Sequence, residues 1–169
     1  MVPAQKPPDT TRIFIFGESA AMGDPEPAFG LPRMLQAMLE LKFPSNRFEV
    51  INVAMTAINS HVVLEVAHDC VAREPDLFVI YMGNNEVVGP YGPSSVFQAW
   101  SPSLRLIRMS IWVKSTRVGQ LLSDVIGRLH RGEATPAKWG GMAMFLDNPV
   151  TADDPRLSSV YDNFRRNLQ

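Results

Sequence analysis

The stretch that decides the fold is Arg12 to Gly23, RIFIFGESAAMG, in which an apolar run leads directly into Gly17-Glu18-Ser19. A short, continuous apolar run is typical of a strand that is covered on both faces. A polar side chain placed directly after such a strand lies where open α/β sheets bind their ligands. Two interpretations of Ser19 follow from this position: it is a nucleophile, or it caps a helix.

The rest of the chain up to Met82 predicts further strands and helices, which alternate along the sequence. Spaced apolar residues predict helices over residues 29–43 and 59–74, and apolar or β-branched runs predict strands over 47–54 and 77–82. Strands that alternate with helices favour a parallel sheet with right-handed crossovers, whose strand ends lie along one edge. The expected fold class is therefore α/β, a three-layer α/β/α sandwich with a parallel sheet.

The pattern is looser beyond Asn84. Residues 87–103 and 131–156 are rich in Gly, Pro and polar residues, whereas residues 104–130 form a long and mostly helical stretch. A cap or lid over the strand ends fits the first loop and the helical stretch. A last helix is predicted over 157–169, with one apolar face made of Leu157, Val160, Phe164 and Leu168.

Composition limits the kind of protein that this is. With 169 residues, of which 46% are hydrophobic, the chain fits one domain: residues 1–11 resemble a linker and residues 12–169 form the domain. The net charge of −1 gives no reason to expect nucleic acid or an anionic membrane surface as a partner. The single Cys70 excludes an intrachain disulfide and offers no metal site by itself. No signal peptide and no membrane-spanning run of about 18 apolar residues is found in this chain.

The three predicted strand ends carry GESAAMG, NVAMTAINS and YMGNNEVVGPYG. Together they resemble blocks one, two and three of the SGNH/GDSL hydrolase superfamily. On that resemblance Ser19 corresponds to the nucleophile, Ala57 stands where the family has an oxyanion-binding glycine, and Asn85 stands where it has an oxyanion-binding asparagine. The resemblance covers residues 12–91 well and the following loops more weakly.

The resemblance implies a serine esterase or acylhydrolase that works through an acyl-enzyme and needs neither a metal nor an organic cofactor. Ser19 would attack the carbonyl of a small-molecule or glycan ester. The backbone N–H groups of Ser19 and Ala57 and the amide of Asn85 would stabilise the oxyanion, because acyl transfer needs donors fixed where negative charge develops. Transfer of the acyl group to a sugar hydroxyl, instead of water, is equally compatible with these residues.

Several residues depart from the family pattern. Glu18 and Glu86 each replace an aspartate, and the Asp-x-x-His that supplies the catalytic base is missing from the chain. His68 is interpreted as an ordinary helical residue and His130 as a charge near a helix end, while His61 follows block two and is near enough in sequence to touch a ligand. We therefore expect the chain to be a fragment, incomplete at its carboxyl end, with the base beyond Gln169.

Two other functions stay open on the sequence. A non-catalytic module that binds carbohydrates or esters would account for the substituted and missing family residues. A nucleotide-binding flavodoxin-like domain would use the same strand ends, but the chain has neither Gly-x-Gly-x-x-Gly nor a P-loop lysine. The aromatic residues are interpreted as core or lid packing in preference to a ligand pocket; they are Tyr91, Trp100, Trp112 and Trp139.

Overall fold

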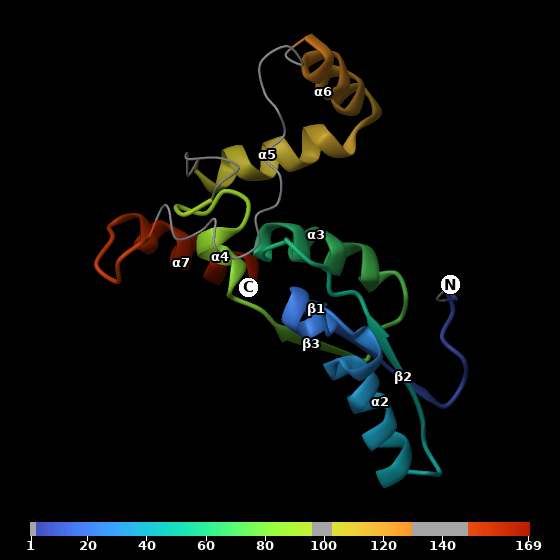
Figure 1. Ribbon diagram of the computed structural model, residues 1–169. Helices are drawn as coiled ribbons and strands as arrows, with labels where there is room; N and C mark the ends of the chain where they lie inside the picture. The colour runs from blue at the N-terminus through green and yellow to red at the C-terminus, as the bar shows by residue number, and fades with distance from the viewer. Residues whose placement is uncertain (1–2, 96–102, 130–148) are drawn as a thin grey trace.

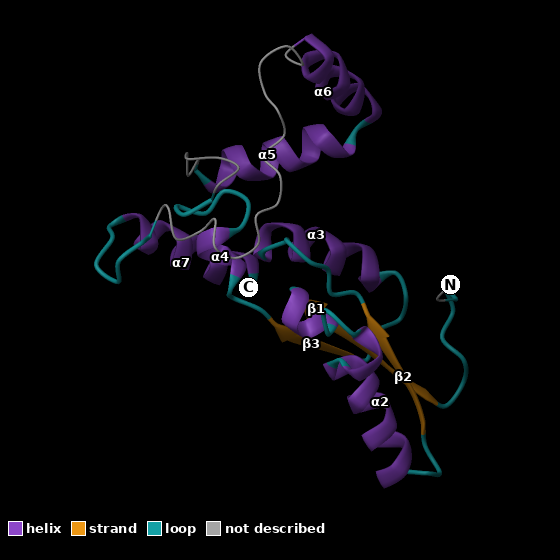
Figure 2. Cartoon of the chain, viewed as in Figure 1, coloured by secondary structure: helices purple, strands orange, loops and turns teal. Residues whose placement is uncertain are grey.

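The protein has an α/β architecture in which helices pack on a three-stranded parallel sheet (Figures 1 and 2). The computed structural model describes residues 3–95, 103–129 and 149–169. The elements, in chain order, are β1 (Thr10–Gly17), α1 (Ser19–Met22), the 3-10 helix η1 (Pro27–Phe29), α2 (Leu31–Lys42), β2 (Arg47–Asn52), α3 (Ser60–Val71), β3 (Leu77–Tyr81), α4 (Asn85–Val88), α5 (Leu104–Ser115), α6 (Arg117–Leu129) and α7 (Arg156–Asn167).

The sheet has the strand order β2-β1-β3, so β1 is central and pairs in parallel with both neighbours. In the register, Ile13 lies opposite Val50 on one side and Leu77 on the other. Figure 1 shows α2 and α3 on opposite faces, the placement that right-handed crossovers produce when the chain crosses first to one side of β1 and then to the other. The predicted parallel α/β sheet is confirmed, and β1 begins two residues earlier than the predicted strand.

The alternation of side chains along β1 explains why its apolar run is continuous. Phe14 and Phe16 point to the α3 face and form a buried cluster there with Val63 and Cys70. Ile13 and Ile15 alternate with them and are also buried, so both faces of the strand are covered. Burying each large side chain stabilises the fold by roughly 1.5–3 kcal/mol. Cys70 is thus a small buried hydrophobe.

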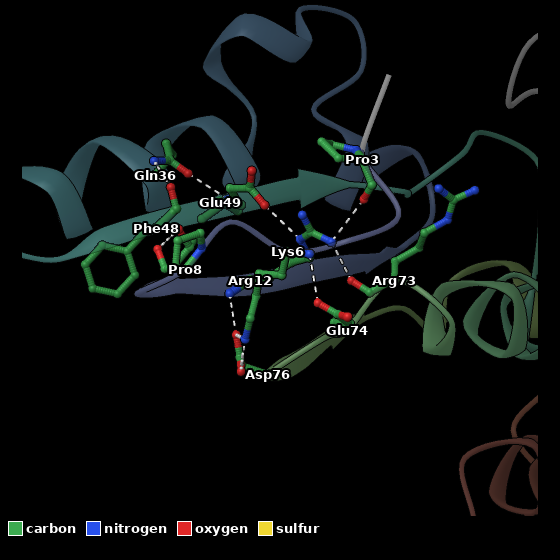
Figure 3. A network of polar contacts seen from close by, with 12 residues as sticks. Pro3, Lys6, Pro8, Arg12, Gln36, Phe48, Glu49, Arg73, Glu74 and Asp76 are labelled. Carbon is green, nitrogen blue, oxygen red and sulfur yellow. Dashed lines mark hydrogen bonds and ion pairs between the residues drawn. The ribbon is translucent and has the colours of Figure 1, made fainter.

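A buried arginine at the other end of β1 ties three segments together (Figure 3). The side chain of Arg12 is 0% exposed, and its Nε donates to Glu49 Oε2 on β2 at 2.7 Å. Its Nη1 donates to the carbonyl oxygens of Arg73 and Pro3 at 2.5 and 3.2 Å. Within the described part of the chain its Nη2 is buried without a hydrogen-bond partner. The guanidinium therefore fixes the entry to β1 against β2 and the turn after α3.

The residues before β1 are attached to the same turn. Lys6 donates its backbone N–H to Glu74 Oε2 at 2.8 Å, and its Nζ lies 2.6 Å from Asp76 Oδ1 (Figure 3). Asp76 also accepts the backbone N–H of Arg12 at 2.6 Å. These bonds hold the amino-terminal residues from Lys6 on against the sheet.

The helical stretch predicted over residues 104–130 is two helices, α5 and α6, which form a hairpin that extends away from the sheet (Figure 1). The break is at Thr116, whose backbone is extended and whose Oγ1 accepts the N–H of Gly119 at 3.0 Å, as an N-terminal cap does. In α7, Leu157 and Val160 are buried as predicted, but Leu168 is 44% exposed and Asn167 is buried instead. In the described residues no helix is long and apolar enough to cross a membrane.

Candidate functional site

The end of β1 lies close against the end of β3, and a glycine makes this possible. Gly17 has φ of +156°, and a Cβ built on it would lie 2.1 Å from the carbonyl oxygen of Tyr81 and 2.5 Å from the Cβ of Ala21. Any other residue would therefore push the two strand ends apart. Ser19 follows two residues later as the first residue of α1, at the carboxyl edge of the sheet.

The helix-cap interpretation of Ser19 is wrong. Glu18, not Ser19, is the N-cap residue of α1, and no side-chain cap bond forms there. Ser19 is partly exposed, and its hydroxyl makes no hydrogen bond within residues 3–95, 103–129 and 149–169. The hydroxyl is thus available to a ligand at the edge of the sheet where the strands end.

The carboxylate of Glu18 binds three successive backbone N–H groups in the turn after β3. It is 1% exposed; its Oε1 accepts from Gly83 at 3.3 Å and Asn85 at 3.0 Å, and its Oε2 accepts from Asn84 at 3.1 Å. Hydrogen bonds to a buried carboxylate are stronger than neutral ones. Glu18 therefore fixes the turn that carries Ser19 to the turn that carries Asn85.

The side chain of Asn85 in turn binds the loop after β2. Its Nδ2 donates to the carbonyl oxygen of Ile58 at 2.8 Å, which uses one of the two amide hydrogens. The preceding residue, Ala57, has φ of +59°, in the left-handed region that favours glycine. The three segments that carry the predicted residues Ser19, Ala57 and Asn85 are thus hydrogen-bonded to one another through their neighbours.

Glu86 makes a second buried carboxylate contact beside the first. It is 6% exposed, and it accepts the backbone N–H of Ser60 at 2.6 Å and the Ser60 hydroxyl at 2.9 Å. Burial raises the pKa of Glu86 above its ordinary value. The two hydrogen bonds from Ser60 lower the pKa, but the effect of each is smaller than that of burial. The turn after β3 is therefore fixed to β1 by Glu18 and to α3 by Glu86.

A residue from the end of α7 completes this cluster, and sequence reasoning missed it. The Asn167 Nδ2 lies 2.9 Å from Ser60 Oγ and 2.9 Å from His61 Nδ1, while Asn167 Oδ1 accepts from Arg108 Nη2 at 3.2 Å. Because Arg108 can only donate, the amide oxygen faces it and the amide nitrogen donates to His61 Nδ1. No sequence signal joins residues more than 100 positions apart.

His61 is a poor candidate for a general base. It is 6% exposed, and burial, together with the nearby charge of Arg108, lowers its pKa to about 4. Its Nδ1 accepts from Asn167, so the proton of the neutral ring is on Nε2. His61 also packs edge to face with Tyr91, with ring centroids 5.9 Å apart. The ring is a structural acceptor within a buried cluster.

Among the described residues, His68 gives Ser19 no partner either. His68 is exposed on α3, and no hydrogen bond joins Ser19 to His61 or His68. His130 lies outside the described residues, as do Trp100 and Trp139. In the part of the chain that the structure describes, no group of three His, Cys, Asp or Glu residues is arranged to hold a metal ion.

A hollow of about 470 Å³ lies between α2 and β2, where Arg33, Gln36 and Phe48 line it but Ser19, Ala57 and Asn85 do not. Ala57 is exposed and Ser19 and Asn85 are partly exposed, so a ligand can reach the strand ends from solvent. Among the described residues, this edge of the sheet offers the hydroxyl of Ser19, the second amide hydrogen of Asn85 and the backbone N–H of Ser19 at the start of α1.

Comparison of the chain with protein-family models, with curated proteins and with solved structures gives no match.

Proposed function

We propose that the chain contributes the nucleophile and the oxyanion donors of a serine esterase or acylhydrolase of SGNH/GDSL type. The observation that carries the proposal is the bonding of Glu18: its carboxylate holds Asn85 in place beside the turn that carries Ser19. Two groups that act on one carbonyl must be fixed relative to each other, because a misplacement of about 1 Å can lower the reaction rate by about a hundredfold.

In this proposal Ser19 Oγ attacks the carbonyl carbon of an ester and forms a tetrahedral intermediate. The N–H of Ser19, the N–H of Ala57 and the second amide hydrogen of Asn85 receive the developing negative charge. The left-handed φ of Ala57 supports this role, since it is a backbone conformation that glycine adopts readily and a residue with a Cβ adopts rarely. Collapse of the intermediate expels the alcohol and leaves an acyl-serine, which water or a sugar hydroxyl then attacks.

The reaction also needs a base for the Ser19 proton, and the described histidines do not contact that residue. The test therefore uses the protein as its gene encodes it, with a short-chain chromogenic ester as substrate. We expect hydrolysis that falls at least about a thousandfold in Ser19→Ala and by roughly two to three powers of ten in Asn85→Ala. Ser158→Ala, an exposed serine of α7, is the matched control and should leave the rate unchanged. Hydrolysis that survives Ser19→Ala would contradict the proposal.

The absence of a base beside Ser19 among the described residues favours one second candidate, a module that binds carbohydrates or esters without turnover. A glycan or ester ligand would then bind equally well to Ser19→Ala, and the whole protein would release no acid from it. Equilibrium binding measured beside the hydrolysis assay separates the two functions. An esterase loses turnover in Ser19→Ala while it keeps most of its affinity.

A further inference from the structure

Charge is distributed unevenly along this nearly neutral chain. Residues 104–129, which form the α5–α6 hairpin, contain five basic residues and one acidic residue, Asp124, for a net charge of +4 within a chain of net charge −1. The basic residues are Arg105, Arg108, Lys114, Arg117 and Arg128. In the described part of the chain no carboxylate forms an ion pair with any of the five. The rest of the chain therefore has a net charge of −5.

The hairpin also exposes large apolar side chains. On α6, Val118, Leu121, Leu122 and Val125 follow the i, i+3, i+4, i+7 spacing of one helix face, and each is between 45% and 68% exposed. Arg117, Asp124 and Arg128 lie on the adjoining face at the same helical spacing. On α5 the exposed apolar residues are Leu106, Met109, Trp112 and Val113. Trp112 is 67% exposed, so it does not pack in the core.

The inner side of the hairpin is firmly attached to the rest of the molecule. Ile107 is 1% exposed, Ser110 Oγ lies 3.4 Å from the Tyr91 hydroxyl, and Arg108 donates to Asn167. Gly119 brings α6 against α5, because a Cβ at this position would lie 1.8 Å from the carbonyl oxygen of Val113. The apolar side chains on the outer surface are thus held in position, and Figure 1 shows the hairpin extending away from the sheet.

We propose that the α5–α6 hairpin docks on the surface of a membrane that contains anionic lipids, with the α6 stripe (Val118, Leu121, Leu122 and Val125) in the interface. An amphipathic helix whose apolar face is flanked by basic residues is the kind that lies in the plane of a bilayer surface. Trp112 suits the same depth, since its ring is largely apolar and carries one donor. The 13 residues of α6 extend only about 20 Å, too short to cross the hydrocarbon core.

Charge favours this occupant over a second copy of the chain. Packing two hairpins face to face would bring two surfaces of net charge +4 together, and like charges in contact oppose association. Anionic headgroups instead attract basic residues by about 1 kcal/mol each, and the apolar stripe adds the burial of side chains that water otherwise covers. Electrostatic attraction and apolar burial therefore both favour binding of the α5–α6 hairpin to an anionic membrane surface.

The test is cosedimentation of the protein with vesicles of phosphatidylcholine alone or mixed with phosphatidylglycerol, at low and high salt. We expect binding to the mixed vesicles that weakens with salt and is much weaker to the neutral ones. Leu121→Asp with Val125→Asp should lower binding at least about tenfold. The matched control is Met38→Asp with Leu41→Asp, which changes apolar residues of α2 that are at least as exposed and should have little effect.

A second pair of variants keeps the apolar face and removes charge. Lys114→Gln with Arg128→Gln should weaken binding to the mixed vesicles about fivefold for each charge removed, and circular dichroism would verify that every variant is folded. With Trp100 and Trp139 changed to Phe, the emission of Trp112 should move to shorter wavelength on binding. The proposal would be overturned if the protein bound neutral and anionic vesicles equally well, or if the α2 control lost as much binding as the α6 variant. It would also be overturned if the protein bound no vesicles and instead self-associated in a way that Leu121→Asp abolishes.

Discussion

Replacing Glu18 by glutamine removes the charge that fixes the turn after β3 and changes little else. The two side chains have nearly the same shape, but glutamine presents one oxygen and one NH₂ group in place of two oxygens. The Glu18 Oε1 accepts from Gly83 and Asn85, and its Oε2 accepts from Asn84. In Glu18→Gln the oxygen can keep the first pair of bonds, while the amide nitrogen meets the N–H of Asn84 as a second donor.

The size of the effect follows from these contacts. The buried amide nitrogen of the glutamine would face the N–H of Asn84 without an acceptor, which costs about 1–3 kcal/mol, and the two remaining bonds weaken because a neutral oxygen replaces a charged one. Glu18 is 1% exposed, so water does not compensate readily. Together these losses should lower the free energy of unfolding by roughly 3 kcal/mol, or lower Tm by roughly 6–12 °C for a domain of this size.

Urea unfolding followed by circular dichroism measures this change. Glu65→Gln is the matched control, since Glu65 is exposed on α3 and its replacement should change the free energy by less than about 0.5 kcal/mol. Glu18→Asp separates charge from reach, because it keeps the charge on a side chain one methylene shorter. If Glu18→Gln unfolded at the same urea concentration as Glu65→Gln, the argument that this carboxylate holds the two strand ends together would be refuted.

Three further predictions concern other parts of the molecule. Arg12→Met should lower the free energy of unfolding by roughly 2–4 kcal/mol in urea melts, since it leaves Glu49 without its buried partner, and an unchanged midpoint would contradict it. Ala57→Gly should raise that free energy by about 0.5–1 kcal/mol by relieving a left-handed φ, whereas Ala37→Gly within α2 should lower it by about as much. His61 has a folded pKa of about 4, below its ordinary 6.5, so the unfolded chain binds its proton more readily and stability should fall by roughly 3 kcal/mol as the pH drops from 6.5 to 4. His61→Asn should remove that slope in melts across this pH range, and an unchanged slope would assign it to other groups.

The sheet could be predicted because its strands have a strong local signal. Residues 13–16 and 77–82 are continuous apolar runs, and the central strand must be apolar on both faces. The break between α5 and α6 was missed because Thr116 is compatible with a helix interior as well as with a cap. Leu168 was placed on the buried face by periodicity alone. The helix ends at Asn167, so the periodicity no longer applies to the next residue.

The candidate site could be predicted only at the positions where strands end. Ser19 and Asn85 are found at the carboxyl edge of a parallel sheet because of their place after β1 and β3. Asn167 could not be found, since its partners Ser60 and His61 lie more than 100 residues away and depend on how α7 packs against α3. Similarly, the near-neutral net charge of the whole chain does not indicate the basic hairpin, because the positive charge of residues 104–129 is offset by negative charge elsewhere in the sequence.

The two buried glutamates beside the strand ends, Glu18 and Glu86, make similar contacts in this structure. Glu18 extends from the end of β1 to the backbone of the turn after β3, and Glu86 extends from that turn to the backbone and hydroxyl of Ser60 at the start of α3. Each carboxylate extends from one segment to the next and accepts backbone N–H groups there. The position of Asn85 relative to Ser19 thus depends on side chains that would take no part in the proposed chemistry. Glu18→Gln should consequently reduce any Ser19-dependent hydrolysis under conditions in which the variant is still folded, whereas a loss of activity that only follows unfolding would limit Glu18 to a role in stability.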